Sequence, residues 1–163
     1  MDFSIRLATD EDLGDVGRIT VEAYHGDGFI DDDMEYTHEL ADAASRARDA
    51  EVWVAVDGSG VLGSVTFCPT GSPFAELAKG NEGEFRMLSV ASQARRRGIA
   101  EALVGRCLER SRELGYDALV LCSMREMATA HRLYERLGFR RTPALDWCPV
   151  EGVELQAFRL NLD

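Results

Sequence analysis

Apolar and polar residues alternate in several segments of the chain, and this alternation predicts β-strands. Phe3–Ala8 alternates as a half-buried strand does. Val52–Val56 and Val61–Phe67 flank the glycine-rich turn Asp57–Gly60, which predicts a β-hairpin. Glu84–Val90 has the composition of a further strand.

Two later segments complete the predicted strands. Ala118–Cys122 is a continuous apolar run, typical of a strand that is covered on both faces. A last strand is expected from about Val153 to Leu160. The segment Pro69–Gly83, rich in small and turn-forming residues, is expected to be a loop.

Helical periodicity fills the intervals between these strands. A first helix is expected from a cap at Thr9 or Asp10 to about Tyr24. A second is expected from the acidic run Asp31–Asp33 to about Arg48, because acids at its start and bases at its end suit the helix dipole.

The strongest helical pattern lies between Arg97 and Leu114, where one face is apolar and Gly115 ends the helix. A shorter helix places Ala130, Leu133, Tyr134 and Leu137 on one face. The resulting order β-α-α-β-β-β-α-β-α-β predicts a single mixed α/β domain over residues 1–163.

Composition and charge narrow the classes of function. The 163 residues include 18 Lys and Arg against 29 Asp and Glu, a formal net charge of −11. This charge argues against binding to nucleic acid or to an anionic membrane. No apolar run reaches the ~18 residues of a membrane span, and the N-terminus lacks a signal pattern, so we expect a cytoplasmic protein. The four cysteines are scattered without a CxxC pair, so no metal site is expected.

One basic segment interrupts the acidic chain. Gln93–Ala100 holds three arginines and no acid, between a predicted strand and the first turn of a helix. The free N–H groups and the positive dipole end of a helix start attract anions. Gly98 would let a phosphate approach the backbone closely, and the arginines would add charge. The alternative is a solvated basic helix start.

Three blocks follow one another along the chain: Met87–Val90 with Arg95–Ala100, a long helix, and Leu133–Phe139. In this order they resemble the GNAT superfamily of N-acetyltransferases. The first block resembles the family's strand and acetyl-CoA pyrophosphate loop. The long helix that follows resembles the one whose start carries the pyrophosphate. Leu133–Phe139 resembles the family's Leu-Tyr-x-x-x-Gly-Phe block, and strong local matching covers about residues 84–141.

The resemblance implies a twisted mixed sheet whose fourth and fifth strands splay apart to admit the pantetheine arm of acetyl-CoA. It assigns cosubstrate binding to Leu88, Ser89, Val90, Arg95, Arg96, Arg97, Gly98, Ile99 and Ala100. The implied reaction is direct acetyl transfer from the thioester to a primary amine of a small molecule or peptide, within a ternary complex.

The resemblance also suggests catalytic residues. Tyr134 matches a tyrosine that reaches the thioester sulfur and would protonate the departing thiolate, although it also lies on the apolar stripe of its helix. Glu84 matches a position where some members place a carboxylate that deprotonates the amine through water; the alternative is an exposed acid at a strand start. Other members place a glutamate where this chain has Cys122, and a nucleophilic role for that cysteine is disfavoured because no activating histidine is near it in sequence.

A departure from the family pattern keeps a second function open. Many members have an asparagine seven residues before the tyrosine, and here that residue is Met127, which cannot replace its polar contact. A catalytically degenerate acyl-CoA-binding sensor or partner subunit is therefore the alternative.

The acceptor site is expected from the parts that match the family weakly. Tyr24, Phe29 and Trp147 are candidate aromatic walls, with core packing as the alternative, and His25 and His38 are surface residues or acceptor-site neighbours. The acidic residues Asp27 and Asp31–Asp33 would favour a cationic acceptor. A homodimer stays possible, because many relatives pair through C-terminal strands or helices.

Overall fold

The computed structural model describes residues 2–26 and 35–162. Within these ranges eight strands form one sheet in the order β1-β2-β3-β4-β5-β8-β6, and β7 pairs with β8. The strands are β1 (Ser4–Leu7), β2 (Glu51–Asp57), β3 (Gly60–Cys68), β4 (Glu82–Val90), β5 (Ala118–Met124), β6 (Arg140–Arg141), β7 (Trp147–Val150) and β8 (Val153–Asn161). In this sheet β4 and β5 run parallel, whereas the other described neighbours run antiparallel.

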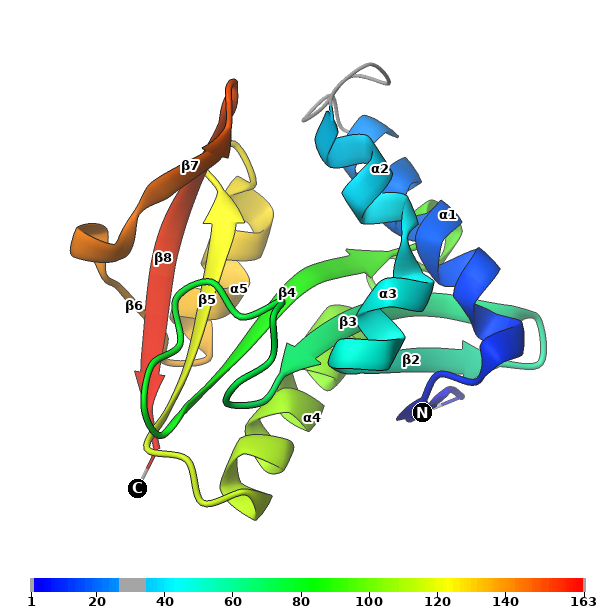
Figure 1. Cartoon of the computed structure of the whole chain (residues 1–163). Coiled ribbons are helices and arrows are strands. Elements are labelled where there is room, and N and C mark those ends of the chain that lie inside the picture. The colour runs from blue at the N-terminus through cyan, green and yellow to red at the C-terminus, as the bar shows by residue number, and fades with distance from the viewer. Residues whose placement is uncertain (1, 27–34, 163) are drawn as a thin grey trace.

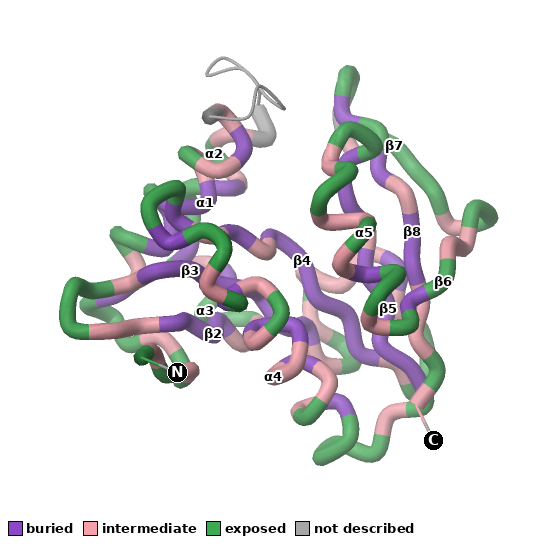
Figure 2. Tube along the Cα trace, turned by 180° about the vertical axis from the view of Figure 1, so that it is seen from behind, coloured by how far each residue is buried: buried purple, intermediate pink, exposed green. Residues whose placement is uncertain are grey.

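Helices cover both faces of the sheet (Figures 1 and 2). The helices are α1 (Leu13–Gly26), α2 (Glu35–Ala41), α3 (Ala43–Asp49), α4 (Ile99–Glu113) and α5 (Ala128–Arg136), and short 3-10 turns occupy Asp10–Asp12, Ser92–Ala94 and Pro143–Leu145. Helices α4 and α5 lie on one face, and α1, α2 and α3 lie on the other. The predicted mixed α/β class is confirmed.

The second predicted helix is wrong as one continuous element. The described part of that segment forms two helices, α2 and α3, which are separated at Asp42. The Asp42 side chain accepts a hydrogen bond from the backbone N–H of Ser45 at 3.1 Å and so caps α3. A local N-cap therefore outweighs the continuous charge pattern, and the predicted start at Asp31–Asp33 lies outside the described residues.

The main core lies between the sheet and the helices α4 and α5. Apolar side chains alternate along β4 and β5, so that Phe85, Leu119 and Leu121 face this core, where they meet Leu103 and Tyr134. A smaller cluster on the opposite face joins α1, α2, β4, β5 and β8 through the side chains Tyr24, Leu40, Met87, Met124, Val153 and Leu155.

Gly63 of β3 allows the end of β4 and the start of α4 to lie close to β3. A Cβ on Gly63 of β3 would lie 2.8 Å from the carbonyl oxygen of Ser89 and 3.1 Å from the Cγ2 atom of Ile99. The missing side chain therefore allows the end of β4 and the start of α4 to pack tightly on β3.

Within the described ranges, no helix has both the length and the apolar character that crossing a bilayer requires.

Candidate functional site

The centre of the site is the point where β4 and β5 separate. Their parallel register ends at Phe85 and Leu121. Beyond this point β4 stays paired with β3 as far as Val90, and β5 stays paired with β8 as far as Met124. Figure 1 shows the two strands side by side near the C-terminus and diverging toward the top of the view. Beyond Phe85 and Leu121, the facing edges of β4 and β5 therefore do not pair with each other. Backbone N–H and C=O groups on such an edge need other hydrogen-bond partners, which a ligand can supply.

A β-bulge in β4 lies directly beyond the last residue of β4 that pairs with β5. The register with β3 shifts between Ser64, opposite Ser89, and Thr66, opposite Arg86. Met87 lies in this register shift and has a φ of 57°, a backbone conformation that residues other than glycine rarely adopt. Bulges bend a strand and increase its twist, and backbone strain of this kind is often found at functional sites.

The predicted phosphate loop, Gln93–Ala100, follows directly from β4. It contains Gly98, the N-cap of α4, which has a φ of 79°. A Cβ built on Gly98 would meet no protein atom within 4 Å, so the space beside this backbone is open to a ligand. The first N–H groups of α4 have no partner within the helix and carry its positive dipole end. The loop is therefore suited to an anion such as a pyrophosphate.

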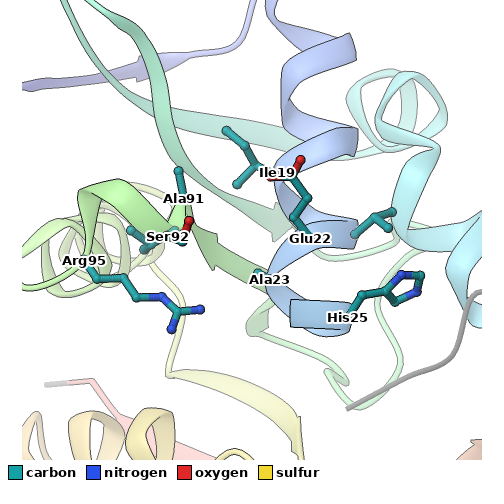
Figure 3. A pocket seen from close by; sticks show the side chains of 9 residues that line it. Ile19, Glu22, Ala23, His25, Ala91, Ser92 and Arg95 are labelled. Atoms are coloured by element: carbon teal, nitrogen blue, oxygen red, sulfur yellow. The ribbon is translucent and has the colours of Figure 1, made fainter. Parts of the chain in front are cut away.

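A cleft lies between this loop and α1. Its volume is about 610 Å³, and its lining includes Val90, Ser92 and Arg95 on one side and Ile19 and Glu22 on the other. Figure 3 shows the Arg95 side chain extending from the loop toward the space that separates it from α1. Of the predicted arginines, Arg95 is thus the one that lines this cleft.

The Arg97 side chain has different partners. Its Nη2 atom lies 2.8 Å from a carboxylate oxygen of Asp2 and 3.3 Å from one of Asp57. These partners hold the guanidinium toward the N-terminus and the β2–β3 turn. Arg96 is exposed, and Ile99 is buried in the main core. The structure thus gives the members of the predicted loop separate positions rather than one cluster of cations.

Tyr134 of α5 lies on the α4–α5 face and is 4% exposed. Its ring packs edge-on against Phe85 and Phe158, with ring centroids 5.8 and 5.6 Å apart. Its hydroxyl shares a hydrogen bond with Ser123 of β5, which lies two residues beyond the last β4 pairing. Burial raises the pKa of the Tyr134 phenol, so the group stays protonated at neutral pH. The sequence was compatible with either a packing role or a catalytic role for Tyr134. In the structure its ring is buried in the core, and its hydroxyl lies where β4 and β5 diverge.

Met127 contacts the same serine. The Ser123 hydroxyl donates to the Met127 sulfur at 3.7 Å, and Met127 is the N-cap residue of α5. The side chain that stands at the family's asparagine position therefore lies near Tyr134, through a weak sulfur contact.

Glu84 is fully buried on the opposite face of the sheet, so it is not the exposed strand-start acid that was the alternative. Its Oε1 atom accepts backbone N–H bonds from Glu76, Leu77 and Ala78 at 2.9, 2.7 and 3.0 Å. Burial raises the pKa of Glu84, and these three bonds oppose the rise. The contacts show Glu84 anchoring the β3–β4 loop.

Glu76 is the functional candidate that the sequence did not reveal. Its Oε1 atom accepts a hydrogen bond from the Cys122 thiol at 3.7 Å and lies 3.4 Å from the Arg86 guanidinium. Burial raises the pKa of Glu76 to about 7, and Arg86 opposes this rise. The one sequence signal is weak: Glu76 is an acid between Ala75 and Leu77 in a predicted loop.

These side chains form what we call the Glu76 cluster: Glu39, Glu76, Glu84, Arg86 and Cys122. Arg86 is 4% exposed and also lies 3.2 Å from the Glu39 carboxylate. The nearest donor atoms of Glu76, Glu84 and Cys122 lie within 4.8 Å of one another. Because a guanidinium already pairs with this group of acids, we assign no metal to it.

Cys122 is unsuited to nucleophilic attack. Burial raises the pKa of its thiol to about 12, so the thiolate is scarce at neutral pH. Its sulfur also has a hydrogen bond with the Trp147 side chain from β7. The predicted aromatic wall Trp147 therefore does lie beside the Glu76 cluster.

The other candidates for the acceptor site are dispersed. Tyr24 is buried in the smaller apolar cluster, which supports the packing alternative. His25 lines the cleft beside α1, and its Nε2 atom lies 3.1 Å from the Thr37 hydroxyl. His38 is exposed on α2. The predicted candidates Asp27, Phe29 and Asp31–Asp33 lie outside the described residues.

Comparison with known proteins identifies the family. The model of the acetyltransferase (GNAT) family matches residues 18–139, which is more than half of the chain. The chain belongs to the GNAT family. This match includes most of α1, the Glu76 cluster, the predicted phosphate loop, α4 and α5.

Curated relatives of this GNAT protein are N-acetyltransferases. N-acetylaspartate synthetase of Rattus norvegicus is 37% identical over 103 residues, which is 63% of this chain and 32% of that protein. N-acetyltransferase family 8 member 2 of the same species is 35% identical over 106 residues, covering 64% of this chain and 46% of that protein. The matched part of the chain thus spans 32% and 46% of the length of these two relatives.

Solved structures share the fold over the whole chain. A GNAT-family acetyltransferase of Staphylococcus aureus Mu50 has a TM-score of 0.79 at 14% identity and covers 99% of both chains. The yncA protein of Salmonella typhimurium, whose structure contains its cofactor acetyl-CoA, has a TM-score of 0.71 at 21% identity and covers 100% of this chain and 95% of that one. At these identities the likeness concerns the fold alone.

Proposed function

We propose that this protein is an acetyl-CoA-dependent N-acetyltransferase that moves the acetyl group directly to a primary amine while both substrates are bound. The observation that carries the proposal is the separation of β4 and β5, followed directly by an open helix N-terminus at Gly98. One element offers unpaired strand edge to an extended arm, and the next offers N–H groups to phosphate. Membership of the GNAT family and the acetyl-CoA in the yncA structure agree with this assignment.

In this proposal the backbone of Leu88, Ser89 and Val90 pairs with the pantetheine arm as a neighbouring strand would. Ser89 and Val90 pair with Ser64 and Gly63 on their β3 side, which leaves the β5 side of the strand for the arm. The pyrophosphate would lie at residues 95–100, where Arg95 borders the cleft and Gly98 leaves space beside its backbone. Acetyl-CoA, when bound, supplies the activated acyl group.

Tyr134 would protonate the departing thiolate. Its raised pKa keeps the phenol protonated before transfer, and its hydroxyl reaches Ser123 in the separated part of β5. The Ser123 hydrogen bond would orient the hydroxyl, and the packing of Phe85 and Phe158 would hold the Tyr134 ring, while the sulfur gains charge.

The acceptor amine would approach from the face of the Glu76 cluster, opposite Tyr134. The carboxylates there, together with the net charge of −11, favour a cationic acceptor. The rat relative's name identifies aspartate as an amine that a related protein acetylates, so aspartate is one acceptor to test.

A thiol-release assay tests the proposal. Purified protein is mixed with acetyl-CoA and, in separate reactions, with L-aspartate, spermidine and a peptide with an N-terminal alanine. We expect CoA release that depends on one acceptor and an acetylated product in the mass spectrum. Saturation by both substrates should follow ternary-complex kinetics, and parallel reciprocal plots would contradict direct transfer.

The alternative is a catalytically degenerate acyl-CoA-binding protein. Two observations favour it: Glu84 accepts three backbone N–H groups, and Met127 offers a sulfur contact at the position where the family resemblance implies an asparagine. A sensor would show stabilisation by CoA in a thermal shift without thiol release on any amine of the panel.

A further inference from the structure

We propose that Glu76 is the general base that receives the proton of the acceptor amine, and that Glu84 is a positioning residue that places it. This proposal rests on the proposed acetyl transfer. It reassigns the base from β4, where the family resemblance suggests Glu84, to the loop between β3 and β4.

The geometry around β5 supports this assignment. Cys122 and Ser123 are consecutive residues just beyond the last β4 pairing, and successive strand residues point to opposite faces. The Cys122 thiol donates to Glu76, whereas Ser123 shares a hydrogen bond with Tyr134. Glu76 and Tyr134 therefore meet β5 from opposite faces at adjacent residues, where the strands separate. A thioester held there would have a proton acceptor on one side and a proton donor on the other.

The buried carboxylate of Glu84 explains how a loop residue can be held accurately. Its Oε1 atom takes the backbone N–H groups of three consecutive loop residues, one of which is Glu76 itself. A carboxylate that accepts such bonds fixes the local backbone more strongly than a neutral acceptor would. Glu84 is 0% exposed and Glu76 has a side chain that is 15% exposed, so Glu76 is the one of the two that solvent or a substrate can reach.

The titratable and charged groups that face Glu76 come from three elements. Arg86 and Glu84 face it from β4, Cys122 from β5 and Glu39 from α2. Burial favours its protonated form and Arg86 favours its ionised form, with burial the larger effect, so the pKa of Glu76 is raised to about 7. A base whose pKa lies near the working pH combines a useful ionised fraction with a strong tendency to take a proton.

The proposed step balances as follows. The amine nitrogen forms a bond to the thioester carbonyl carbon, and the carbon–sulfur bond breaks with its electron pair remaining on sulfur. The proton lost by the amine passes to the Glu76 carboxylate, and the sulfur receives the Tyr134 proton. Glu76 then releases its added proton to water, and Tyr134 regains a proton from water. The net products are the amide and the CoA thiol.

The central test compares Glu76→Gln and Glu84→Gln across pH, with the best acceptor of the thiol-release panel. For the wild type we expect kcat/KM to rise through a midpoint near pH 7. Glu76→Gln should lower kcat/KM about 10²-fold and remove this rise of kcat/KM with pH, which we call the pH limb. Glu84→Gln keeps an oxygen for the loop N–H groups, so it should keep the limb and most of the rate. The opposite result, in which only Glu84→Gln removes the limb, would overturn the proposal.

Two further variants separate positioning from chemistry. Glu84→Ala removes the loop anchor and should lower kcat at least about tenfold, and the rate should recover in Glu84→Gln. Glu39→Gln removes the other carboxylate beside Arg86 but leaves Glu76 in place, and it should keep the pH limb. If Glu39→Gln removed the limb as well, the limb would belong to the charge network and not to Glu76.

A titration without acceptor gives an independent measurement. In protein labelled with ¹³C-glutamate, the Glu76 side-chain signal is the one missing from Glu76→Gln, and its midpoint should lie near 7. A midpoint near the ordinary value of 4.5 would overturn the assignment of the base. Absence of thiol release from the wild type with every acceptor would instead overturn the proposed function itself, so the two failures are distinguishable.

Discussion

The two halves of the candidate site are built in different ways. The half that would bind the cosubstrate, from β4 through the start of α4, consists of backbone: a bulge at Met87, a free strand edge and the helix N-terminus at Gly98. The half that would receive the acceptor consists of the side chains of the Glu76 cluster, which come from α2, the β3–β4 loop, β4 and β5.

If the two halves bind donor and acceptor as proposed, this difference would let one scaffold keep the same donor while the acceptor changes. Backbone geometry depends on a few special residues, such as glycine at a positive φ, and tolerates changes of the surrounding side chains. A cluster of side chains changes its charge and shape with each substitution. We therefore expect mutations in the first half to affect CoA binding and those in the second half to affect catalysis and pH dependence.

The largest expected effect comes from Gly98→Val, which places a branched side chain in the open space beside the helix start. Two or more charged hydrogen bonds to phosphate would be lost, so we expect the Kd for CoA to rise about 10²–10³-fold in isothermal titration.

Gly71→Val is the matched control, because Gly71 also has a positive φ, of 88°, and no atom within 4 Å of a built Cβ, but lies in the β3–β4 loop. Both variants carry the same kind of backbone strain. Equal losses of CoA affinity in the two would show that strain, and not the phosphate loop, causes the effect.

Tyr134→Phe tests whether the α4–α5 face takes part in catalysis. The ring contacts with Phe85 and Phe158 remain, while the hydroxyl and its bond to Ser123 are lost. We expect kcat to fall about 10²-fold with the Kd for CoA nearly unchanged. Tyr116→Phe, which removes only a hydroxyl that accepts the Thr70 N–H, should keep wild-type turnover. An unchanged kcat in Tyr134→Phe would reduce Tyr134 to a packing residue.

The two outer arginines of the loop should behave differently, although the sequence does not distinguish them. Arg95→Gln removes a cation that lines the cleft and should weaken CoA binding about tenfold, with a shallower salt dependence. Arg97→Gln removes contacts to Asp2 and Asp57 and should change the affinity less than about twofold. A larger loss for Arg97→Gln would reverse the assignment of the pyrophosphate contact.

The smallest expected effect is a pH-dependent change in stability at Glu76. Because the folded-state pKa of Glu76 is raised to about 7, the wild type loses stability as pH rises from about 4.5 through 7. Gln does not titrate, so the Tm of Glu76→Gln minus that of the wild type should be more positive at pH 8 than at pH 5. Each 1 kcal/mol would appear as a Tm change of about 2–4 °C. An equal difference at both pH values would contradict the raised pKa.

Several sequence predictions were confirmed because the relevant signals are local. The hairpin turn at Asp57–Gly60, the amphipathic pattern of α4 and the order of the longer strands and helices all depend on residues close in sequence. The division between α2 and α3 was missed because the Asp42 cap was outweighed by a longer charge pattern. Strands β6 and β7 are short, and they are stabilised by pairing with β8 rather than by a pattern of their own.

The acceptor half was beyond the reach of sequence reasoning. Glu76 and Cys122 are separated by 46 positions, and no spacing links a loop acid to a strand cysteine. Glu84 resembled a free acid because its partners are backbone N–H groups, which every residue except proline carries. Only the folded loop shows that these donors converge on one carboxylate.

The α/β class, the glycine at the start of α4 and the family resemblance can be inferred from the amino-acid sequence, because they depend on local backbone preferences and contiguous motifs. The folded chain is needed to see which arginine lines the cleft, which glutamate anchors the loop and which one lies beside Cys122. Burial and charge pairing control these roles, and both arise only when distant segments pack together.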